Sequence, residues 1–188
     1  MRKKDARSER TEAAVKSALL EAMAAKELED IGVAEIARAA GISRSTFYAH
    51  YQNLGEVFQE MVGDLQSKYS PLVQQLRCDA CQSGERQPFC MRIRNAGVYQ
   101  PVVDSPRFLE AVLEVREGVP EGDIYAQLVD AGLPQDVARA VYRFQMSGCY
   151  AAARDASLSD AADWERVRAA LDVFIRGGIA ALRNEMVR

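Results

Sequence analysis

The stretch "GISRSTFYAHYQNLGEVF", residues 41–58, decides the fold, and it begins with a glycine that can end a helix. Gly41 suits the left-handed conformation found just after helix C-termini, and the hydroxyl of Ser43 can cap a following helix. Residues 33–40 and 43–51 are therefore predicted to form two short helices joined by a tight turn. The small side chain of Ala37 lets them cross closely, which is the layout of a helix-turn-helix.

The second of these helices carries an unusual set of side chains for a protein surface. Phe47 is expected to fill the wedge between the two helices, together with Ile42. Arginine can donate two hydrogen bonds to guanine, while hydroxyls and tyrosine reach phosphates or base edges. The opposite face therefore suits the major groove of DNA, and it consists of Arg44, Ser45, Thr46, Tyr48 and His50, the last being the only histidine of the chain. The alternative is a surface helix of a bundle, with its rings packed on neighbouring helices.

Helical patterns continue on both sides of this stretch. Apolar residues from Val15 to Met23 repeat at the spacing of one helix face, and Asn53 can cap a longer helix that would extend to Leu72. Further along, helix starts are predicted at Pro88, Ser105–Pro106, Pro134 and Ser159, and a helix end at Gly132. No stretch shows the alternation of a β-strand. The sequence therefore predicts an all-α protein of about nine helices.

Four segments carry a resemblance to a known family: "RTEAAVKSALLEAM", "EIARAAGIS", "TFYAHY" and "LGEVF". In this order, over residues 7–62, they resemble the DNA-binding domain of the TetR family of transcriptional regulators. The resemblance implies an N-terminal three-helix helix-turn-helix domain and a C-terminal helical bundle that binds a ligand and dimerises. On this basis residues 1–9 are expected to be a flexible basic arm, 10–54 the DNA-binding domain, and 55–188 the effector-binding and dimerisation domain.

The resemblance also places the recognition helix at residues 43–50. The DNA contacts that it implies are Arg44, Ser45, Thr46, Tyr48 and His50, with Tyr48 and Tyr51 expected on phosphates, and Ser43, Gly32 and Val33 at the two helix N-termini. Phe47 is expected in the core. For His50 the alternative is a residue that only caps or packs the end of its helix.

Three positions depart from the pattern of the family. Most members have threonine at the position of Gly32, many have a basic residue at Ala34, and lysine is usual at Leu54. Each lost phosphate contact lowers affinity for all DNA sequences and flattens its salt dependence by about one ion. The basic arm, with Arg2, Lys3, Lys4 and Arg7, is expected either to compensate along the DNA backbone or to be a solubilising tail.

The second part of the chain is expected to hold an apolar pocket and a dimer interface. The candidates for the pocket are aromatic and aliphatic residues, most of which will also be core: Phe89, Tyr99, Phe108, Val112, Tyr125, Leu128, Tyr142 and Met146. The last two helices mix small residues with large apolar ones, and the resemblance implies that they pair across a two-fold axis. The interface candidates are Val141, Phe144, Gly148, Ala151, Ala152, Leu171, Phe174, Ile175 and Gly178. An intramolecular helical hairpin is the alternative.

Four cysteines invite a metal or redox interpretation: Cys78, Cys81, Cys90 and Cys149. A zinc site needs four ligands, and here one Cys-x-x-Cys pair has only a single cysteine nearby. Small, mostly buried apolar side chains are the favoured interpretation, so no metal site and no cofactor is expected. Thiol-based redox sensing stays open as an alternative.

Composition limits the remaining choices. The net charge is −3, but residues 1–54 hold nine basic and eight acidic residues while the rest hold 15 and 19, so positive charge gathers at the N-terminal end. No secretory signal and no membrane-spanning run is recognisable, which predicts a cytoplasmic protein. No acid–base or nucleophile constellation points to an enzyme.

These observations favour a homodimeric regulator that binds a palindromic double-stranded DNA operator, acts as a repressor and is released by an unknown small-molecule effector. The alternatives are a relative that no longer binds DNA and acts by protein–protein contacts, as the departures at Gly32, Ala34 and Leu54 suggest, and the redox-responsive regulator.

Overall fold

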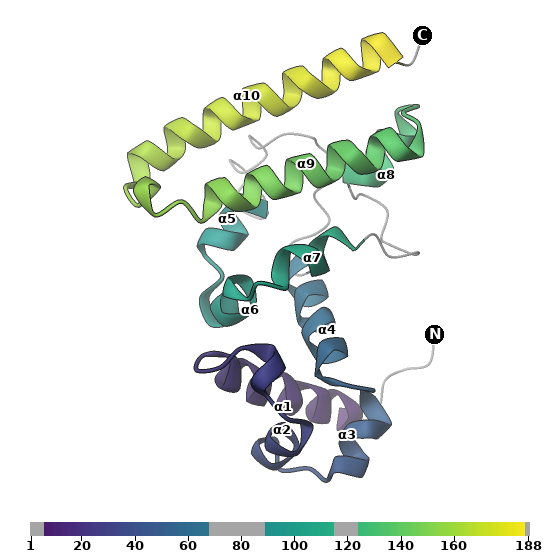
Figure 1. Cartoon of the computed structure of the whole chain (residues 1–188), viewed down its shortest axis with the longest axis vertical. Coiled ribbons are helices and arrows are strands. Elements are labelled where there is room, and N and C mark those ends of the chain that lie inside the picture. The colour runs from purple at the N-terminus through teal and green to yellow at the C-terminus, as the bar shows by residue number, and fades with distance from the viewer. Residues whose placement is uncertain (1–5, 68–88, 115–123, 187–188) are drawn as a thin grey trace. The chain divides into compact units, whose positions relative to one another are not determined.

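The structure is a computed structural model that describes residues 6–67, 89–114 and 124–186. Within these ranges it contains ten α-helices, three short 3-10 turns and no strand (Figure 1). The all-α prediction is therefore confirmed. The helices divide into two compact units. One consists of the described residues up to Gln66 together with Ala96–Val112. The other consists of the described residues between these two segments together with those from Leu113 onward.

The first unit contains the two helices of the helix-turn-helix and four further α-helices. Its elements are α1 (Ala6–Met23), η1 (Leu28–Asp30), α2 (Val33–Ala39), α3 (Arg44–His50), α4 (Leu54–Ser67), η3 (Gly97–Tyr99), α6 (Gln100–Asp104) and α7 (Phe108–Leu113). The last residues of α4 and α7, Ser67 and Leu113, fall in the second unit. Helix α1 packs against α2, α3 and α6. The core between them is apolar and fully closed to water, with Val15, Leu19, Ile36, Phe47, Val57 and Met61 at its centre. Burial of this kind stabilises a unit in which helices such as α2 and α3, of seven residues each, are too short to persist alone.

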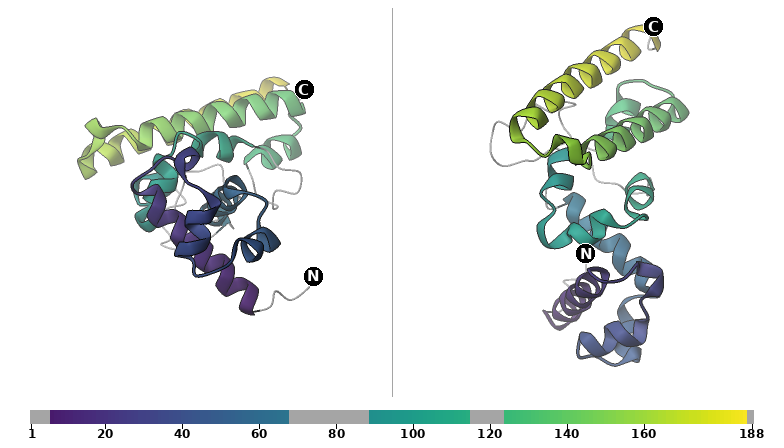
Figure 2. Two further views of the ribbon diagram at one scale, coloured as in Figure 1. Left: turned by 60° about the horizontal axis from the view of Figure 1, so that its bottom comes forward. Right: turned by 60° about the vertical axis from the view of Figure 1, so that its left-hand side comes forward.

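The second unit is built around two long helices, which the views of Figure 2 show in green and yellow. Its elements are α5 (Phe89–Arg94), α8 (Ile124–Asp130), α9 (Gln135–Ala153), η4 (Ala156–Leu158) and α10 (Ala161–Met186). Helix α9 packs against α5 and α8. One apolar cluster joins α8, α9 and α10 through Leu128, Leu133, Ala138 and Ile179. Arg94 ties α5 to the α9–α10 turn, because it donates to the carbonyls of Ala153 (3.4 Å) and Leu158 (2.6 Å).

Several predicted helix boundaries are confirmed and two are displaced. Gly41 and Gly132 have φ of 68° and 94° and follow α2 and α8, as expected of glycines after helix ends. Helix α7 begins at Phe108 instead of Pro106, because residues 105–107 form a turn that the Ser105 carbonyl closes by accepting from the Phe108 amide at 3.0 Å. Helix α10 begins at Ala161 instead of near Ser159, since the carboxylate of Asp160 accepts from the amides of the first turn at 2.8 and 3.2 Å.

The first compact unit extends beyond the expected DNA-binding domain. It includes α4 and residues 96–112, which the sequence assigned to the effector-binding part. Lys16 of α1 contributes to this, because its ammonium lies 2.9 Å from Glu60 and 2.5 Å from Asp64, both on α4. Where effector binding begins along the chain stays a prediction. The continuation of α4 toward Leu72 lies outside the described residues.

Candidate nucleic-acid interface

The turn between α2 and α3 sets the start of the candidate recognition helix. The Gly41 amide donates to the Arg38 carbonyl at 3.1 Å and the Ile42 amide to the Ala37 carbonyl at 2.9 Å, which closes the end of α2. The hydroxyl of Ser43 then accepts from the Thr46 amide at 3.0 Å and caps α3, as predicted. One of the orphan amides of the first turn thus has a partner, and the cap fixes where α3 begins.

Helix α3 separates an inward ring from an outward polar face. Phe47 is fully buried, as predicted, whereas the neighbouring Tyr48 is 57% exposed and meets the Phe47 ring edge-on at 5.5 Å between centroids. Arg44 and Ser45 are also exposed, and Thr46 is half-buried. The hydroxyl of Ser43 lies 2.8 Å from the hydroxyls of both Ser45 and Thr46. The outward face therefore combines a guanidinium, a phenol and clustered hydroxyls, which are the donors that reach phosphates and base edges.

Tyr51 does not lie where the sequence prediction needs it. The side chain is only 4% exposed, its ring is 5.8 Å from that of Phe47, and its hydroxyl is buried without a hydrogen-bond partner in the described part of the chain. Burial and the neighbouring carboxylate of Glu60 raise the pKa of the Tyr51 phenol well above its ordinary value. A phosphate contact by Tyr51 does not fit this structure, because the residue follows the last turn of α3 and faces the core.

His50 is also turned away from the outward face. Its side chain is 19% exposed, and its Nδ1 lies 3.6 Å from the Glu12 carboxylate and 3.5 Å from the Ser8 hydroxyl, both on α1. The alternative of a helix-end residue that packs therefore matches its placement better than a direct DNA contact. Of the predicted contact set, the structure brings together on one exposed face Ser43, Arg44, Ser45 and Tyr48, with Thr46 at its edge.

The comparison with known protein families agrees with this geometry. Residues 16–61 match the family described as bacterial regulatory proteins, tetR family. These residues are a TetR-family domain. A domain of this kind supports a DNA-binding transcriptional regulator of TetR type, and its helix-turn-helix is formed by α2 and α3. No curated protein and no solved structure matches the chain. No helix among the described residues is long and apolar enough to cross a membrane.

The start of α2 shows what two of the departures from the TetR pattern do. Gly32 is the N-cap of α2 and is exposed, but it has no side chain to cap the helix, while Val33 and Ala34 are half-buried. A Cβ added at Gly32 would meet nothing within 4 Å, and its backbone angles of −99° and 144° suit any residue. The structure would thus accept a hydroxyl side chain at this position without rearrangement. Leu54, the third departure, is buried and belongs to the core.

Sequence reasoning missed a charged cluster that joins the first and fourth helices of the first unit. Lys16 and its partners Glu60 and Asp64 are only partly exposed and join α1 to α4. Burial lowers the pKa of Lys16, but its hydrogen bonds to Asp64 and Glu60 outweigh that effect and raise it above the ordinary value. Two features of the sequence could have indicated this cluster. Lys16 stands beside the apolar positions of α1, and the two acidic residues are spaced one turn apart on α4.

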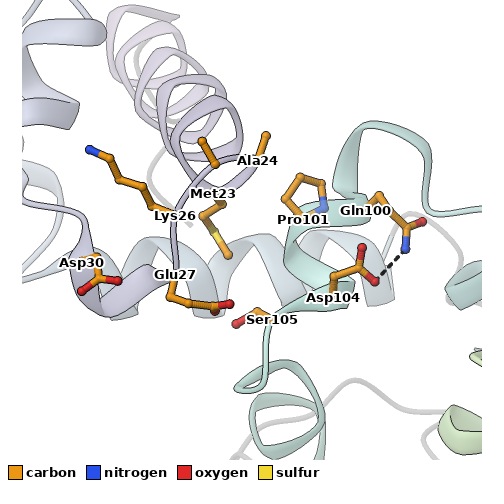
Figure 3. A pocket seen from close by; sticks show the side chains of 10 residues that line it. Met23, Ala24, Lys26, Glu27, Asp30, Gln100, Pro101, Asp104 and Ser105 are labelled. Atoms are coloured by element: carbon orange, nitrogen blue, oxygen red, sulfur yellow. Dashed lines mark hydrogen bonds between the residues drawn. The ribbon is translucent and has the colours of Figure 1, made fainter.

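The predicted effector residues do not gather in one described cavity. Tyr99, Phe108 and Val112 belong to the first unit, whereas Phe89, Tyr125, Leu128, Tyr142 and Met146 belong to the second. A groove of about 590 Å³ lies within the first unit between the α1–η1 connection and α6 (Figure 3). Its lining residues are Met23, Ala24, Ala25, Lys26, Glu27, Asp30, Gln100, Pro101, Asp104 and Ser105. None of the predicted effector residues is among them, and their role stays a prediction.

The predicted dimer residues fall on partly or fully exposed positions of α9 and α10. Phe144 and Phe174 are 70% and 64% exposed, which is unusual for phenylalanine. Gly148, Ala151 and Gly178 are exposed, and Val141, Ala152, Leu171 and Ile175 are half-buried. Val141 and Ile175 also pack on the apolar cluster of the second unit. In the part of the unit that the structure describes, Phe144, Gly148, Ala151, Phe174 and Gly178 are exposed to solvent.

The cysteines offer no metal site in the residues that the structure describes. Cys90 and Cys149 are buried, on α5 and α9. Cys78 and Cys81 lie outside the described residues, as does the basic arm up to residue 5. Among the described residues no group of three or more histidine, cysteine or acidic side chains could hold a metal ion. The redox alternative stays a prediction.

Proposed function

We propose that the protein binds a palindromic DNA operator as a homodimer, represses transcription, and is released by a small-molecule effector. The observation that carries the DNA-binding part is the outward face of α3. Arg44, Ser45 and Tyr48 are exposed on a helix whose start is capped by Ser43 and whose opposite side is anchored by the buried Phe47. A recognition helix needs this combination, because base readout requires side chains that reach outward from a fixed backbone.

The homodimer is supported by the apolar face of α9 and α10. Phe144, Gly148 and Ala151 are spaced by four and three residues and so share one side of α9, and Phe174 and Gly178 share one side of α10. Exposed apolar surface of this kind marks an interaction site, and small residues let facing helices approach closely. Two-fold pairing would direct two copies of α3 at half-sites about one DNA turn apart.

The test measures binding of the dimer to DNA selected in vitro and to the region upstream of its own gene, at low and moderate salt. Arg44→Ala and Tyr48→Ala are expected to weaken selective binding by about tenfold each, as for lost base or phosphate contacts. Arg139→Ala, which removes an exposed arginine of α9, is the matched control and should leave affinity unchanged. The absence of any sequence-selective binding by the unmodified protein at either salt would refute the proposal.

A second function is favoured by specific positions. Leu54 is buried, Gly32 has no side chain, and Ala34 is half-buried. Three contacts to the DNA phosphate backbone that the resemblance to the family implies are therefore missing. A co-regulator that binds another protein through the exposed apolar face of α9 and α10 would fit these positions. It predicts that DNA selection yields no consensus while the purified protein still associates through Phe144 and Phe174.

A further inference from the structure

The polar contact at the C-terminal end of the recognition helix involves three side chains. The Ser8 hydroxyl donates to the Glu12 carboxylate at 3.1 Å, and His50 Nδ1 lies 3.5 Å from that hydroxyl and 3.6 Å from that carboxylate. The side chains of His50 and Glu12 are only 19% and 14% exposed. Ser8 and Glu12 stand one turn apart at the start of α1, and His50 is the last residue of α3. We refer to these residues as the Ser8–Glu12–His50 cluster.

Helix α3 depends on its neighbours for its orientation. It has seven residues, and a helix of this length does not persist alone in water. Ser43 holds its start and Phe47 its middle, through a cap and through burial. Apolar contacts determine how deeply α3 is buried but define its rotation about its own axis only weakly, whereas polar contacts are directional. The Ser8–Glu12–His50 cluster supplies a directional contact at the far end, between α3 and α1.

Acidic side chains near His50 come from α1 and α4, and the two on α4, Glu60 and Asp64, are paired with Lys16. Glu12 faces it from α1. The adjoining Tyr51, whose ring centroid lies 6.4 Å from that of His50, is close enough to Glu12, Glu60 and Asp64 for all three carboxylates to raise the pKa of its phenol. A hydrogen-bond donor at position 50 therefore faces the Glu12 carboxylate on α1. A side chain that grips a DNA phosphate must instead reach outward, as Tyr48 does.

We propose that His50 is a positioning residue: it holds the end of the recognition helix against α1 through Glu12 and Ser8, and it does not contact operator phosphate. This inference rests on the proposed function, because it assigns the orientation of α3 to a contact within the protein. The sequence pattern alone had placed His50 on the DNA.

The test compares affinity for the selected operator, its salt dependence and the coupling between residues 12 and 50. His50→Ala is expected to weaken specific binding by about threefold to tenfold, the range for loss of one directional contact. Glu12→Gln is expected to weaken it by less, because the amide oxygen of glutamine still accepts but more weakly than a carboxylate. The double variant should be no weaker than the weaker single variant, because both changes break the same link. His50→Asn should restore most of the affinity, since its amide nitrogen takes about the place of Nδ1 and can still donate to the Ser8 hydroxyl. All variants should keep the salt slope of the unmodified protein.

Glu9→Gln is the matched control. It removes the same charge from an exposed position of α1, three residues before Glu12, and so reports the effect of charge alone on DNA affinity. A salt slope that falls by about 0.9 in His50→Ala would show a phosphate contact and overturn the inference. Effects of His50→Ala and Glu12→Gln that multiply in the double variant would also overturn it. If His50→Ala fails to fold, Glu12→Gln and His50→Asn decide the same question.

A second measurement separates failure of this inference from failure of the proposed function. His50 is the only histidine, so its imidazole resonances are assigned in the NMR spectrum without ambiguity. Without any DNA, Glu12→Gln should shift these resonances clearly and Glu9→Gln should not. If the protein binds no operator, the proposed function fails while this comparison still tests the link. Resonances unchanged by Glu12→Gln would refute the link whatever the protein binds.

Discussion

The exposed phenylalanines of α9 and α10 allow the proposed dimer to be tested with a calculated effect. Phe144 is 70% and Phe174 is 64% exposed. Taking about 200 Å² for the surface of a phenylalanine, each leaves roughly 130 to 140 Å² in water. At about 25 cal/mol per Å², complete cover of that surface would contribute roughly 3.5 kcal/mol per side chain.

Alanine at position 144 keeps a methyl group, and interfaces convert buried area into affinity incompletely. A loss of about 2 kcal/mol per side chain is therefore the realistic value. Because a two-fold interface contains Phe144 twice, Phe144→Ala should cost about 4 kcal/mol, which weakens dimerisation about a thousandfold. The fold of the monomer should not change, since the side chain has little packing within its own unit.

Sedimentation velocity over a range of protein concentrations measures this dimer constant directly. Tyr48→Ala is the matched control, since it removes another exposed ring, 57% open to solvent, from the recognition helix. It should lower DNA affinity and leave the dimer intact, whereas Phe144→Ala should lose the dimer and, through it, operator affinity at low concentration. An unmodified protein that sediments as a monomer at about 10 µM, where a stable dimer with a nanomolar constant would be complete, would refute the reasoning. So would a dimer constant that changes less than about threefold in Phe144→Ala.

Three further outcomes follow from the first unit. Gly32→Thr should raise the free energy of unfolding by about 0.5 kcal/mol in chemical denaturation, because a cap is added where a Cβ meets no atom, and Gly32→Ala should lack the part that is due to the hydroxyl. The raised pKa of the Tyr51 phenol means that its contribution to folding stability is complete below the ordinary pKa of 10.0 and is lost as the pH rises above that value. Tyr51→Phe should reduce this loss of stability in alkaline unfolding curves. The raised pKa of Lys16 acts in the same direction above 10.5, so its contribution should be complete at neutral pH, and Lys16→Met should unfold with a smaller alkaline loss than the unmodified protein.

The helix-turn-helix could be predicted because its determinants are local. A glycine with φ of 68°, a serine that caps the next helix and a buried phenylalanine one turn later each act within a few residues of the chain. Local chemistry of this kind is readable from the sequence. The all-α class followed for the same reason, since helical periodicity is a property of short windows.

The direction of individual side chains at the end of α3 could not be predicted in this way. His50 and Tyr51 stand in a run of outward-looking polar and aromatic residues, and the resemblance to the family assigned both to DNA. Their placement depends on Glu12, which is 38 residues earlier in the chain than His50, and on Glu60 of α4. Such partners are set by packing between helices and leave no periodic signal. The extent of the first unit was missed for a related reason, because residues 96–112 join it across the intervening chain.

The contacts within the first unit also constrain how an effector could change DNA binding. The chain passes between the two units near residues 66, 95 and 112, so three covalent connections lead from the second unit into the first. One of them enters at α4, which is tied to α7 by a hydrogen bond from the Gln59 side chain to the Ala111 carbonyl at 3.1 Å and to α1 by Lys16. On the proposed role of His50, α1 is in turn tied to the end of α3. A displacement of α4 that keeps the Lys16 pairs must therefore move α1 or strain the Ser8–Glu12–His50 cluster, and either result changes the angle of the recognition helix. If the Lys16 ion pairs are removed, effector binding should therefore no longer change the affinity for the operator. The protein should still bind the effector and the operator separately, because the link between α1 and α4 is lost while both binding surfaces remain.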